Sequence, residues 1–223
     1  MKNQSGIRKY EQGADYGPIR TFGRVHGKKL SARQQWLVEN LLPVLLPVPH
    51  SLRGEKILEI GFGNGEHLRE VAIGNPDAIV IGAEPFINGV ASLLSSITEI
   101  GDIVKPEYRN ICIWPDDVRK LLSRISYLLS AIYILHPDPW PKARHEKRRL
   151  LNADFLNLLA SRLDADGQII IGTDHHEYYD WIVAQVKNTD LKIKTTKMEI
   201  IRTRYQKKNK AETSAPKYLV LSR

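Results

Sequence analysis

A short strand, a glycine turn and a helix follow one another in residues 56–73. The apolar run KILEI leads into GFGNG at 61–65, and a helix is expected from Glu66 to about Ile73. Glycines let a ligand approach bare backbone, and the first turn of a helix supplies free N–H groups. This order is typical of a site for a nucleotide-type ligand, although a plain tight turn is the simpler interpretation of the glycines alone. The predicted backbone contacts are Gly61, Gly63 and Gly65.

Carboxylates follow the next two predicted strands. The strand at 78–83 ends at Glu84, where a side chain can accept hydrogen bonds from both ribose hydroxyls of a nucleoside. A third strand at 110–113 is followed by Asp117, which is placed to bind an adenine amino group; a helix cap is the alternative role. A helix is expected to fill residues 118–129.

The spacing of the glycines favours a cofactor without phosphates. The dinucleotide pattern GxGxxG would need glycine at position 66, where this chain has Glu66. An acid beside the turn would also repel a pyrophosphate. S-adenosylmethionine fits such a site.

The sequence AIYILHPDPWPKARHEKRR at 131–149 joins a buried strand to a rigid turn and a cluster of bases. The turn at 136–141 holds Asp138 and Trp140 among three prolines. A stiff turn and a solvated charge run would explain either half alone. Their junction at a strand end instead indicates a carboxylate beside phosphate-binding side chains. The basic cluster consists of Lys142, Arg144, His145, Lys147, Arg148 and Arg149.

Charge is unevenly distributed along the chain. Residues 1–30 hold seven Lys or Arg against two acids and residues 187–223 hold eleven against three, whereas residues 31–186 hold fifteen against twenty. This segregation favours a catalytic body that holds a polyanion through a basic rim, with an ordinary soluble surface as the alternative. We expect residues 1–30 to form a flexible basic arm and residues 31–223 a single domain.

Three further strands are predicted near the end of the chain, at 168–172, 191–195 and 217–221. The strand at 168–172 is followed by Asp174, which is expected to face the same crevice as Asp138. The apolar residues of 150–163 recur at helical spacing and are predicted to be core, with Gly167 ending that helix. A polar loop before the last strand, at 217–221, contains Thr203, Arg204, Tyr205 and Gln206.

Several classes of protein are disfavoured. The single Cys112 excludes an internal disulfide and a cysteine zinc cluster, and it suits a reducing cytoplasm. No segment resembles a signal peptide, and no apolar run is long enough to span a membrane. The adjacent His175 and His176 diverge at a helix start without a suitably spaced third ligand, so no metal is expected. We expect a cytoplasmic protein that is either a monomer or a homodimer.

These motifs together resemble the bacterial tRNA guanine-N7 methyltransferases. The resemblance rests on LEIGFGNG at 58–65, GAEPF at 82–86, HPDPWPKARHEKRR at 136–149, TD at 173–174 and TRY at 203–205. The segment RTFGRVHGKKLSARQQ at 20–35 is similar to the entry segment of that family. About nine-tenths of the chain takes part, and the stretch at 136–149 is the most specific motif.

The resemblance implies an α/β fold of the Rossmann-like class I S-adenosylmethionine-dependent methyltransferases. Its sheet would have seven strands, mostly parallel, with the last strand antiparallel. The implied reaction is methylation of N7 of a guanine in tRNA, in the variable loop, with Asp138 as the catalytic carboxylate. The family's cofactor-binding acids match Glu59, Glu84, Asp117 and Asp138. Its substrate-binding positions match Lys142, Asp174 and 203–206, and the tRNA phosphate contacts are expected at Arg144, Lys147, Arg148 and Arg149.

Two residues depart from the family pattern. His136 stands where an aromatic such as Phe is usual, and Gln206 stands where Glu is usual. The amide of Gln206 can accept a hydrogen bond from guanine but lacks the charge of a carboxylate. Two other functions remain open at this point: a non-catalytic tRNA-binding protein on a methyltransferase scaffold, and a methyltransferase for another RNA base. The NPPY-type tetrad typical of amino-group methylation is absent, because the chain has HPDPW instead.

Overall fold

The computed structural model describes residues 21–23, 25, 27–47, 54–99, 101–194 and 216–223. Within these residues one seven-stranded sheet has the order β3-β2-β1-β4-β5-β7-β6. Strand β7 is antiparallel to both of its neighbours, while the other pairs are parallel, which confirms the expected sheet. The strands are β1 (Lys56–Ile60), β2 (Ile79–Ala83), β3 (Ile111–Trp114), β4 (Leu129–Leu135), β5 (Leu163–Thr173), β6 (Lys192–Lys194) and β7 (Lys217–Ser222).

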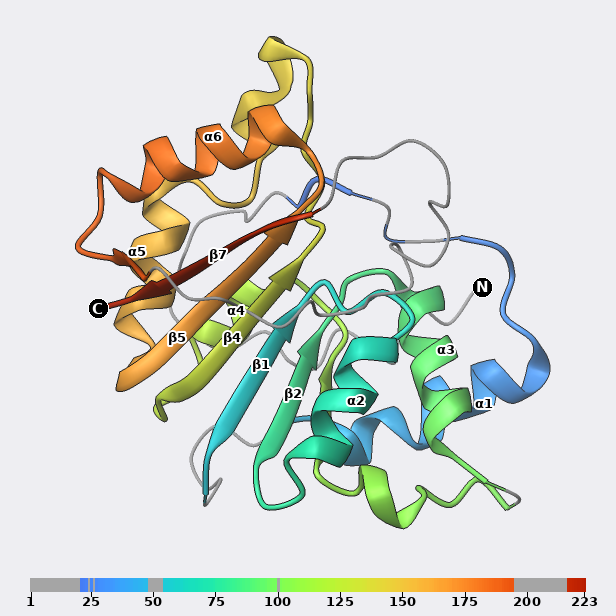
Figure 1. The fold of residues 1–223 in the computed structure, drawn as a ribbon. Helices are drawn as coiled ribbons and strands as arrows, with labels where there is room; N and C mark the ends of the chain where they lie inside the picture. The colour runs from blue at the N-terminus through green and yellow to red at the C-terminus, as the bar shows by residue number, and fades with distance from the viewer. Residues whose placement is uncertain (1–20, 24, 26, 48–53, 100, 195–215) are drawn as a thin grey trace.

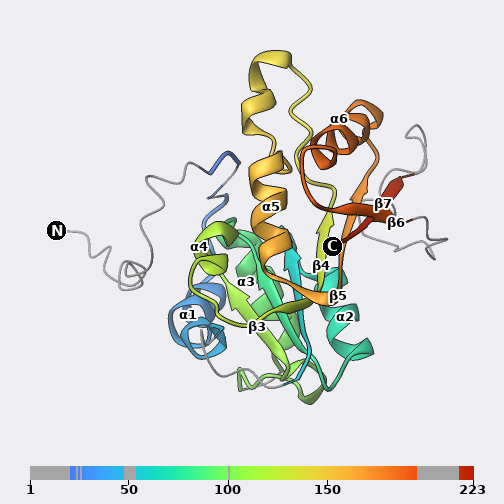
Figure 2. The same cartoon turned by 90° about the vertical axis from the view of Figure 1, so that its left-hand side faces the viewer.

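Helices cover both faces of this sheet (Figures 1 and 2). One core cluster joins the sheet to α4, α5 and α6, and a second joins it to α1, α2 and α3. Consecutive residues of β1 serve opposite faces, since Ile57 belongs to the second cluster and Leu58 to the first. The helices are α1 (Ala32–Asn40), α2 (Glu66–Gly74), α3 (Ile87–Ile97), α4 (Val118–Leu122), α5 (Ala153–Ser161) and α6 (His176–Val186), with 3-10 turns η2 (Leu42–Leu45), η3 (Pro106–Tyr108) and η4 (Ala143–Arg148).

The sheet order reverses at β1, which pairs with β2 on one side and β4 on the other. Loops from these strands therefore separate at their carboxyl ends and leave a crevice, the usual ligand position in such sheets. The segment at 142–149 stands beyond the same edge, at the top of both views (Figures 1 and 2). None of the described helices is long and apolar enough to cross a membrane.

The predicted helix at 118–129 was wrong in its second half. Helix α4 ends at Leu122, and the chain enters β4 at Leu129, whose N–H donates to Arg162 O at 2.9 Å. Leu129, which local apolar spacing assigned to a helix, is therefore in a strand, because it pairs with Leu163 of β5.

Gly167 was also misassigned as the residue that ends a helix. Strand β5 begins at Leu163 and continues through Gly167, and the β4–β5 register shifts between Leu129 and Ala131. A Cβ atom at Gly167 would lie 2.8 Å from Leu129 O, so the glycine permits close approach of two backbones. Helix α5 begins after Asn152, which caps it by accepting from the Phe155 N–H at 3.0 Å, and ends at Ser161, before Leu163 enters β5.

The described part of the first thirty residues contacts the body of the protein. Ile87 N–H donates to Val25 O at 3.1 Å, and Asn88 exchanges hydrogen bonds with Gly27 N–H and Lys28 O. Ser31 caps α1, with its side chain accepting from the Gln34 N–H and the Gln34 side chain accepting from the Ser31 N–H. The division into an arm and a domain stays a prediction, because residues 1–20 lie outside the described part.

Candidate active site at the carboxyl edge of the sheet

A cavity of about 590 Å³ opens at the carboxyl ends of β1, β2 and β4. This volume is in the range of small-molecule sites. Its wall includes the predicted residues Gly61, Glu84, Asp117 and Asp138, which therefore lie around one space. Residues 21–23, the segment at 147–150 and the beginning of α5 also line the cavity.

The glycine turn after β1 has the conformation that only glycine adopts readily. Gly61, Gly63 and Gly65 have φ angles of 74°, 57° and 75°. No atom lies within 4 Å of where a Cβ would stand at Gly61 or Gly63, so a ligand can reach the backbone there. Gly89 of α3 was not predicted, yet its Cβ would lie 2.3 Å from Gly63 O. Its only sequence signal is a glycine inside a helical pattern.

Glu84 holds this turn in place. Its two carboxylate oxygens accept from Gly63 N–H at 2.8 Å and from Phe86 N–H at 2.9 Å. Burial raises the pKa of Glu84, the two backbone hydrogen bonds oppose the rise, and the nearby charges of Asp138 and Glu59 add to it. Each carboxylate oxygen of Glu84 can still accept one more hydrogen bond. Binding of ribose hydroxyls by Glu84 stays a prediction that this geometry permits.

Glu59 lies behind the turn and is 4% exposed. Its Oε2 atom is 3.0 Å from His67 Nδ1 of α2, and the His67 ring packs edge-on against Tyr133 of β4. His67 is a second residue that the sequence did not reveal, because a histidine in a first helical turn has no distinctive pattern. The expected contact of Glu59 with the cofactor stays a prediction.

Asp117 has the structural role that was the alternative interpretation of the sequence. It caps α4, with Oδ1 accepting from Arg119 N–H and Nε–H and Oδ2 accepting from Arg119 Nη2–H and Thr21 Oγ1–H. Burial alone would raise the pKa of Asp117, but the hydrogen bonds from Arg119 and Thr21 lower it. Four donors occupy the usual acceptor positions of a carboxylate. Binding of an adenine amino group here would therefore require Thr21 to move.

Residues 136–141, which we call the Asp138 loop, follow β4 and reach the opposite wall of the cavity. Asp138 is exposed and lies close enough to Glu84 to affect its pKa. His136 and Trp140 have φ angles of 52° and 43°, which is unusual for residues with a Cβ. The predicted rigidity thus coexists with two unfavourable backbone conformations.

Asp174 follows β5 and lies beside this loop. Its Oδ1 atom is 3.8 Å from His136 Nδ1, and its side chain is 31% exposed. Burial lowers the pKa of His136, while the neighbouring Asp174 raises it, and the net shift is downward. His136, the departure from the family pattern, therefore faces one of the predicted substrate-binding acids. The structure brings Asp174 next to a cavity-lining residue.

The two histidines after Asp174 have local roles. His175 caps α6, with Nδ1 accepting from Tyr178 N–H at 3.2 Å, and His176 begins the helix. Among the described residues, no three His, Cys, Asp or Glu side chains are grouped so that they could hold a metal ion.

The basic segment divides into exposed and buried side chains. Lys142, Arg144 and Lys147 are exposed. Arg148 lines the cavity, with its guanidinium carbon 5.0 Å from the Trp140 ring centre and 5.6 Å from that of Phe22. Arg149 is only 5% exposed and donates to backbone carbonyls. Arg149 also belongs to the cavity wall, and the phosphate contact expected there stays a prediction, which the burial of its guanidinium does not favour.

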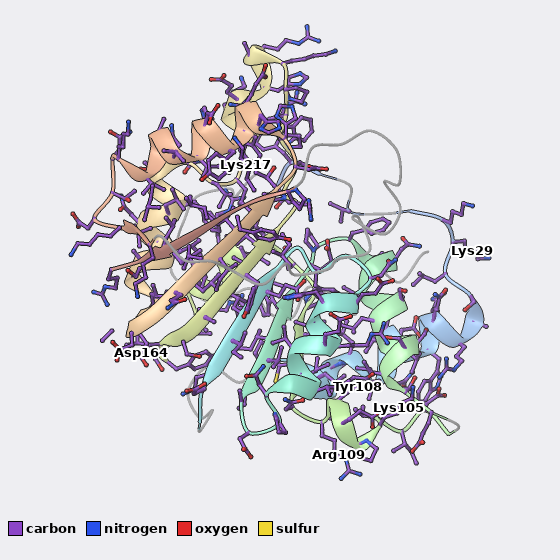
Figure 3. The ribbon with its side chains drawn as sticks, in the orientation of Figure 1. Lys29, Lys105, Tyr108, Arg109, Asp164 and Lys217 are labelled. Carbon is purple, nitrogen blue, oxygen red and sulfur yellow. The ribbon has the colours of Figure 1, made fainter. Side chains whose placement is uncertain are left out.

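The sequence did not reveal several other residues of this edge. Lys217 pairs with Thr173 at the start of β7, and its Nζ is 4.9 Å from the Tyr179 ring centre (Figure 3). Leu150, Phe155 and Leu158 were expected to be core only, but they also line the cavity. The predicted substrate residues Thr203, Arg204, Tyr205 and Gln206 lie outside the described residues.

Comparisons with known proteins agree with this arrangement. A family model described as "Putative methyltransferase" matches residues 53–216. The tRNA (guanine-N(7)-)-methyltransferase of Neorickettsia sennetsu is 34% identical over 85% of this chain and 85% of its own. The protein of the same name from Sphingopyxis alaskensis is 44% identical over 71% of each chain.

Among solved structures, the 16S rRNA methyltransferase KamB aligns with 88% of this chain and 97% of its own, at a TM-score of 0.52 and 14% identity, which shows the fold alone. The matched family model and the two relatives together extend over the glycine turn, the Asp138 loop and the basic segment. This chain therefore belongs to the family of tRNA (guanine-N7)-methyltransferases, whose methyl donor is S-adenosylmethionine.

Proposed function

We propose that this protein transfers a methyl group from S-adenosylmethionine to N7 of a guanine in tRNA, in the variable loop. The relatives that cover most of the chain carry this activity in their names. A tRNA substrate and the lone Cys112 suit action in the cytoplasm.

The observation that best supports the proposal is the position of the basic segment relative to the cavity. Exposed Lys142, Arg144 and Lys147 follow the Asp138 loop directly, and Asp138 lines the cavity. Phosphates of an RNA strand would bind these cations while one of its bases enters the cavity. A methyltransferase for a small molecule would have no need of this surface.

The cavity suits a cationic cofactor that has no phosphates. Bare backbone at Gly61 and Gly63 can approach a ligand, and Glu84 retains acceptor positions for ribose hydroxyls. Glu84 and Asp138 lie on the wall of the same cavity and favour a positively charged group between them. When bound, S-adenosylmethionine supplies an electrophilic methyl group on a sulfonium.

The reaction needs orientation more than proton transfer. Guanine N7 has an in-plane lone pair and no proton, so no general base is required to create the nucleophile. The protein must align N7 with the methyl group, which is a matter of positioning. Positive charge then appears on the purine, and the Asp138 carboxylate stabilises it. Asp138 and Asp174 are also suited to accept from the N1 and N2 donors of guanine.

The guanine must leave the tRNA stack to reach this pocket. Trp140 offers an aromatic surface beside Asp138, although Arg148 and His145 already contact its ring. Lys142, Arg144, Lys147 and Arg148 would position the neighbouring phosphates.

The proposal is tested by incubating unmodified tRNA with the protein and methyl-labelled S-adenosylmethionine. Mass spectrometry of the nucleosides should find the label in 7-methylguanosine, and nuclease mapping should place it in the variable loop. Label in a different nucleoside would contradict the assignment of the acceptor.

Asp138→Asn tests the role of the carboxylate, because it removes the charge and keeps the shape of the side chain. Turnover should fall at least 100-fold, on the order of 3 kcal/mol, whereas affinity for tRNA should change little. Wild-type turnover in a folded Asp138→Asn protein would refute the role of this carboxylate. If wild-type protein binds tRNA and never methylates it, a non-catalytic tRNA-binding protein becomes the better description.

A further inference from the structure

The Asp138 loop holds its functional side chain on an unfavourable backbone. His136 and Trp140, two residues before and two after Asp138, both have left-handed φ angles. Such conformations persist only where surrounding contacts impose them. One end of the loop is held by His136 N–H, which donates to Gly172 O at 2.7 Å. The other end requires a different partner.

Arg149 provides that partner from inside the protein. Its Nε–H donates to Pro139 O at 2.9 Å, and an Nη2 hydrogen donates to Trp140 O at 3.4 Å. These carbonyls belong to the two residues that directly follow Asp138. A planar guanidinium can serve two neighbouring carbonyls at once, which an ammonium group cannot do with the same geometry.

Helix α6 fixes the guanidinium in turn. The Arg149 guanidinium carbon is 5.6 Å from the Tyr178 ring centre and 5.0 Å from that of Trp181. Cation–π contacts of this kind are strongest where water is excluded, and Arg149 is 5% exposed. Burial raises the pKa of Tyr178, with Arg149 lowering it and Asp138 raising it, so both charges act on one phenol. Helix α6 begins directly after Asp174 and His175.

We propose that Arg149 is a positioning residue, which holds the Asp138 loop against α6 so that Asp138 and Asp174 keep a fixed spacing around the guanine. This inference rests on the proposed function and assigns Arg149 a role distinct from that of the neighbouring basic side chains. Both arginines line the cavity, but Arg148 is half-buried and lies over the rings of Phe22 and Trp140, whereas Arg149 is buried against α6. One arginine contacts the substrate, and the next one shapes the loop.

The test is steady-state kinetics of Arg149→Lys and Arg149→Ala with unmodified tRNA. Because small displacements of a reacting group are costly, kcat should fall about 30- to 100-fold in both variants. KM for tRNA should stay within about threefold, since no phosphate contact is lost. Arg148→Ala should show the reverse pattern, with higher KM and a smaller salt dependence of tRNA binding.

Chemical rescue separates positioning from a general loss of folding. Guanidinium ion, kept below concentrations that unfold the protein, should raise kcat of Arg149→Ala in a saturable manner, whereas ammonium should not. Arg33→Ala is the matched control, because Arg33 pairs with Asp102 and does not line the cavity. This control should keep wild-type kcat and show no response to guanidinium.

Trp181→Leu tests the same idea if neither Arg149 variant folds. It removes one ring from the guanidinium and should lower kcat without raising KM for tRNA. The inference is overturned if wild-type protein methylates tRNA and folded Arg149→Lys keeps its kcat. It is equally overturned if the defect lies in KM and the salt dependence, as for a phosphate contact. Failure of the wild type to methylate tRNA would instead refute the proposed function.

Discussion

The two halves of the carboxyl edge are built in different ways. On the β1–β3 side, Glu59, Glu84 and Asp117 are buried and each interacts with other groups of the protein. On the β4–β5 side, Asp138 is exposed and the Asp174 side chain is 31% exposed. In the proposed function, the β1–β3 side is the cofactor half and the β4–β5 side is the substrate half. The acids of the first are held by the protein's own groups, whereas those of the second remain accessible.

The backbone follows the same division. The cofactor half places glycines at its left-handed positions, where they cost little. The substrate half places His136 and Trp140 there, each at a cost of about 1–3 kcal/mol. That cost explains why the substrate half needs the hydrogen bonds of Arg149, and why its geometry is the more sensitive to substitution.

The largest effect is expected from Glu84→Ala. This change leaves the N–H groups of Gly63 and Phe86 without their charged acceptor. The free-energy cost of losing these hydrogen bonds is about 3 kcal/mol. Affinity for S-adenosylmethionine, measured by calorimetry, should fall at least 100-fold. The affinity of Glu84→Gln should lie between that of the wild type and that of Glu84→Ala. An affinity within a few-fold of wild type would show that the cofactor half does not depend on this carboxylate.

Asp174→Asn should affect the other half alone. The amide presents N–H groups where guanine also presents donors, so kcat/KM for tRNA should fall about 30-fold, or about 2 kcal/mol. Affinity for S-adenosylmethionine should stay unchanged, because Asp174 follows β5 and lies beside His136, on the substrate half of the edge. A comparable loss of cofactor affinity would break the division into two halves.

Asp117→Asn should weaken the fold in a pH-dependent way. The pKa of Asp117 is lowered in the folded protein from an ordinary value of 3.8. Its charge therefore stabilises the fold above that value, and the contribution disappears as pH falls through the lower folded-state pKa. Denaturant unfolding should show a loss of about 1–2 kcal/mol at pH 7. The gap between variant and wild type should close at strongly acidic pH; a constant gap would refute the ionic origin.

The smallest effect is expected from Arg144→Ala on the exposed surface. Loss of one phosphate contact should weaken tRNA binding about threefold and reduce the slope of log affinity against log salt by about 0.7–0.9. Filter binding over a range of salt concentrations measures both quantities. An unchanged slope would place the phosphates elsewhere on the protein, with Lys217 as the next residue to substitute.

Local sequence predicted most strands, because parallel strands buried on both faces are continuous apolar runs. It also predicted that Glu84, Asp117 and Asp138 lie around one cavity, since the ends of neighbouring parallel strands share one edge, whereas Glu59 and Asp174 do not line that cavity. The errors at 118–129 and at Gly167 have a common cause. Pairing between Leu129 and Leu163 overrides helical spacing, and no pattern within one segment reports a partner in another.

The charged residues show the same limit most clearly. Arg144 and Arg149 belong to one basic run, yet one is exposed and the other is buried. Their difference depends on Tyr178 and Trp181, about thirty residues later in the chain, which cover one guanidinium and not the other. Sequence alone therefore determined the order of elements, the edge at which the acids gather and the family. Only the tertiary structure decided which charges of the basic run are exposed, because burial is set by contacts between distant segments.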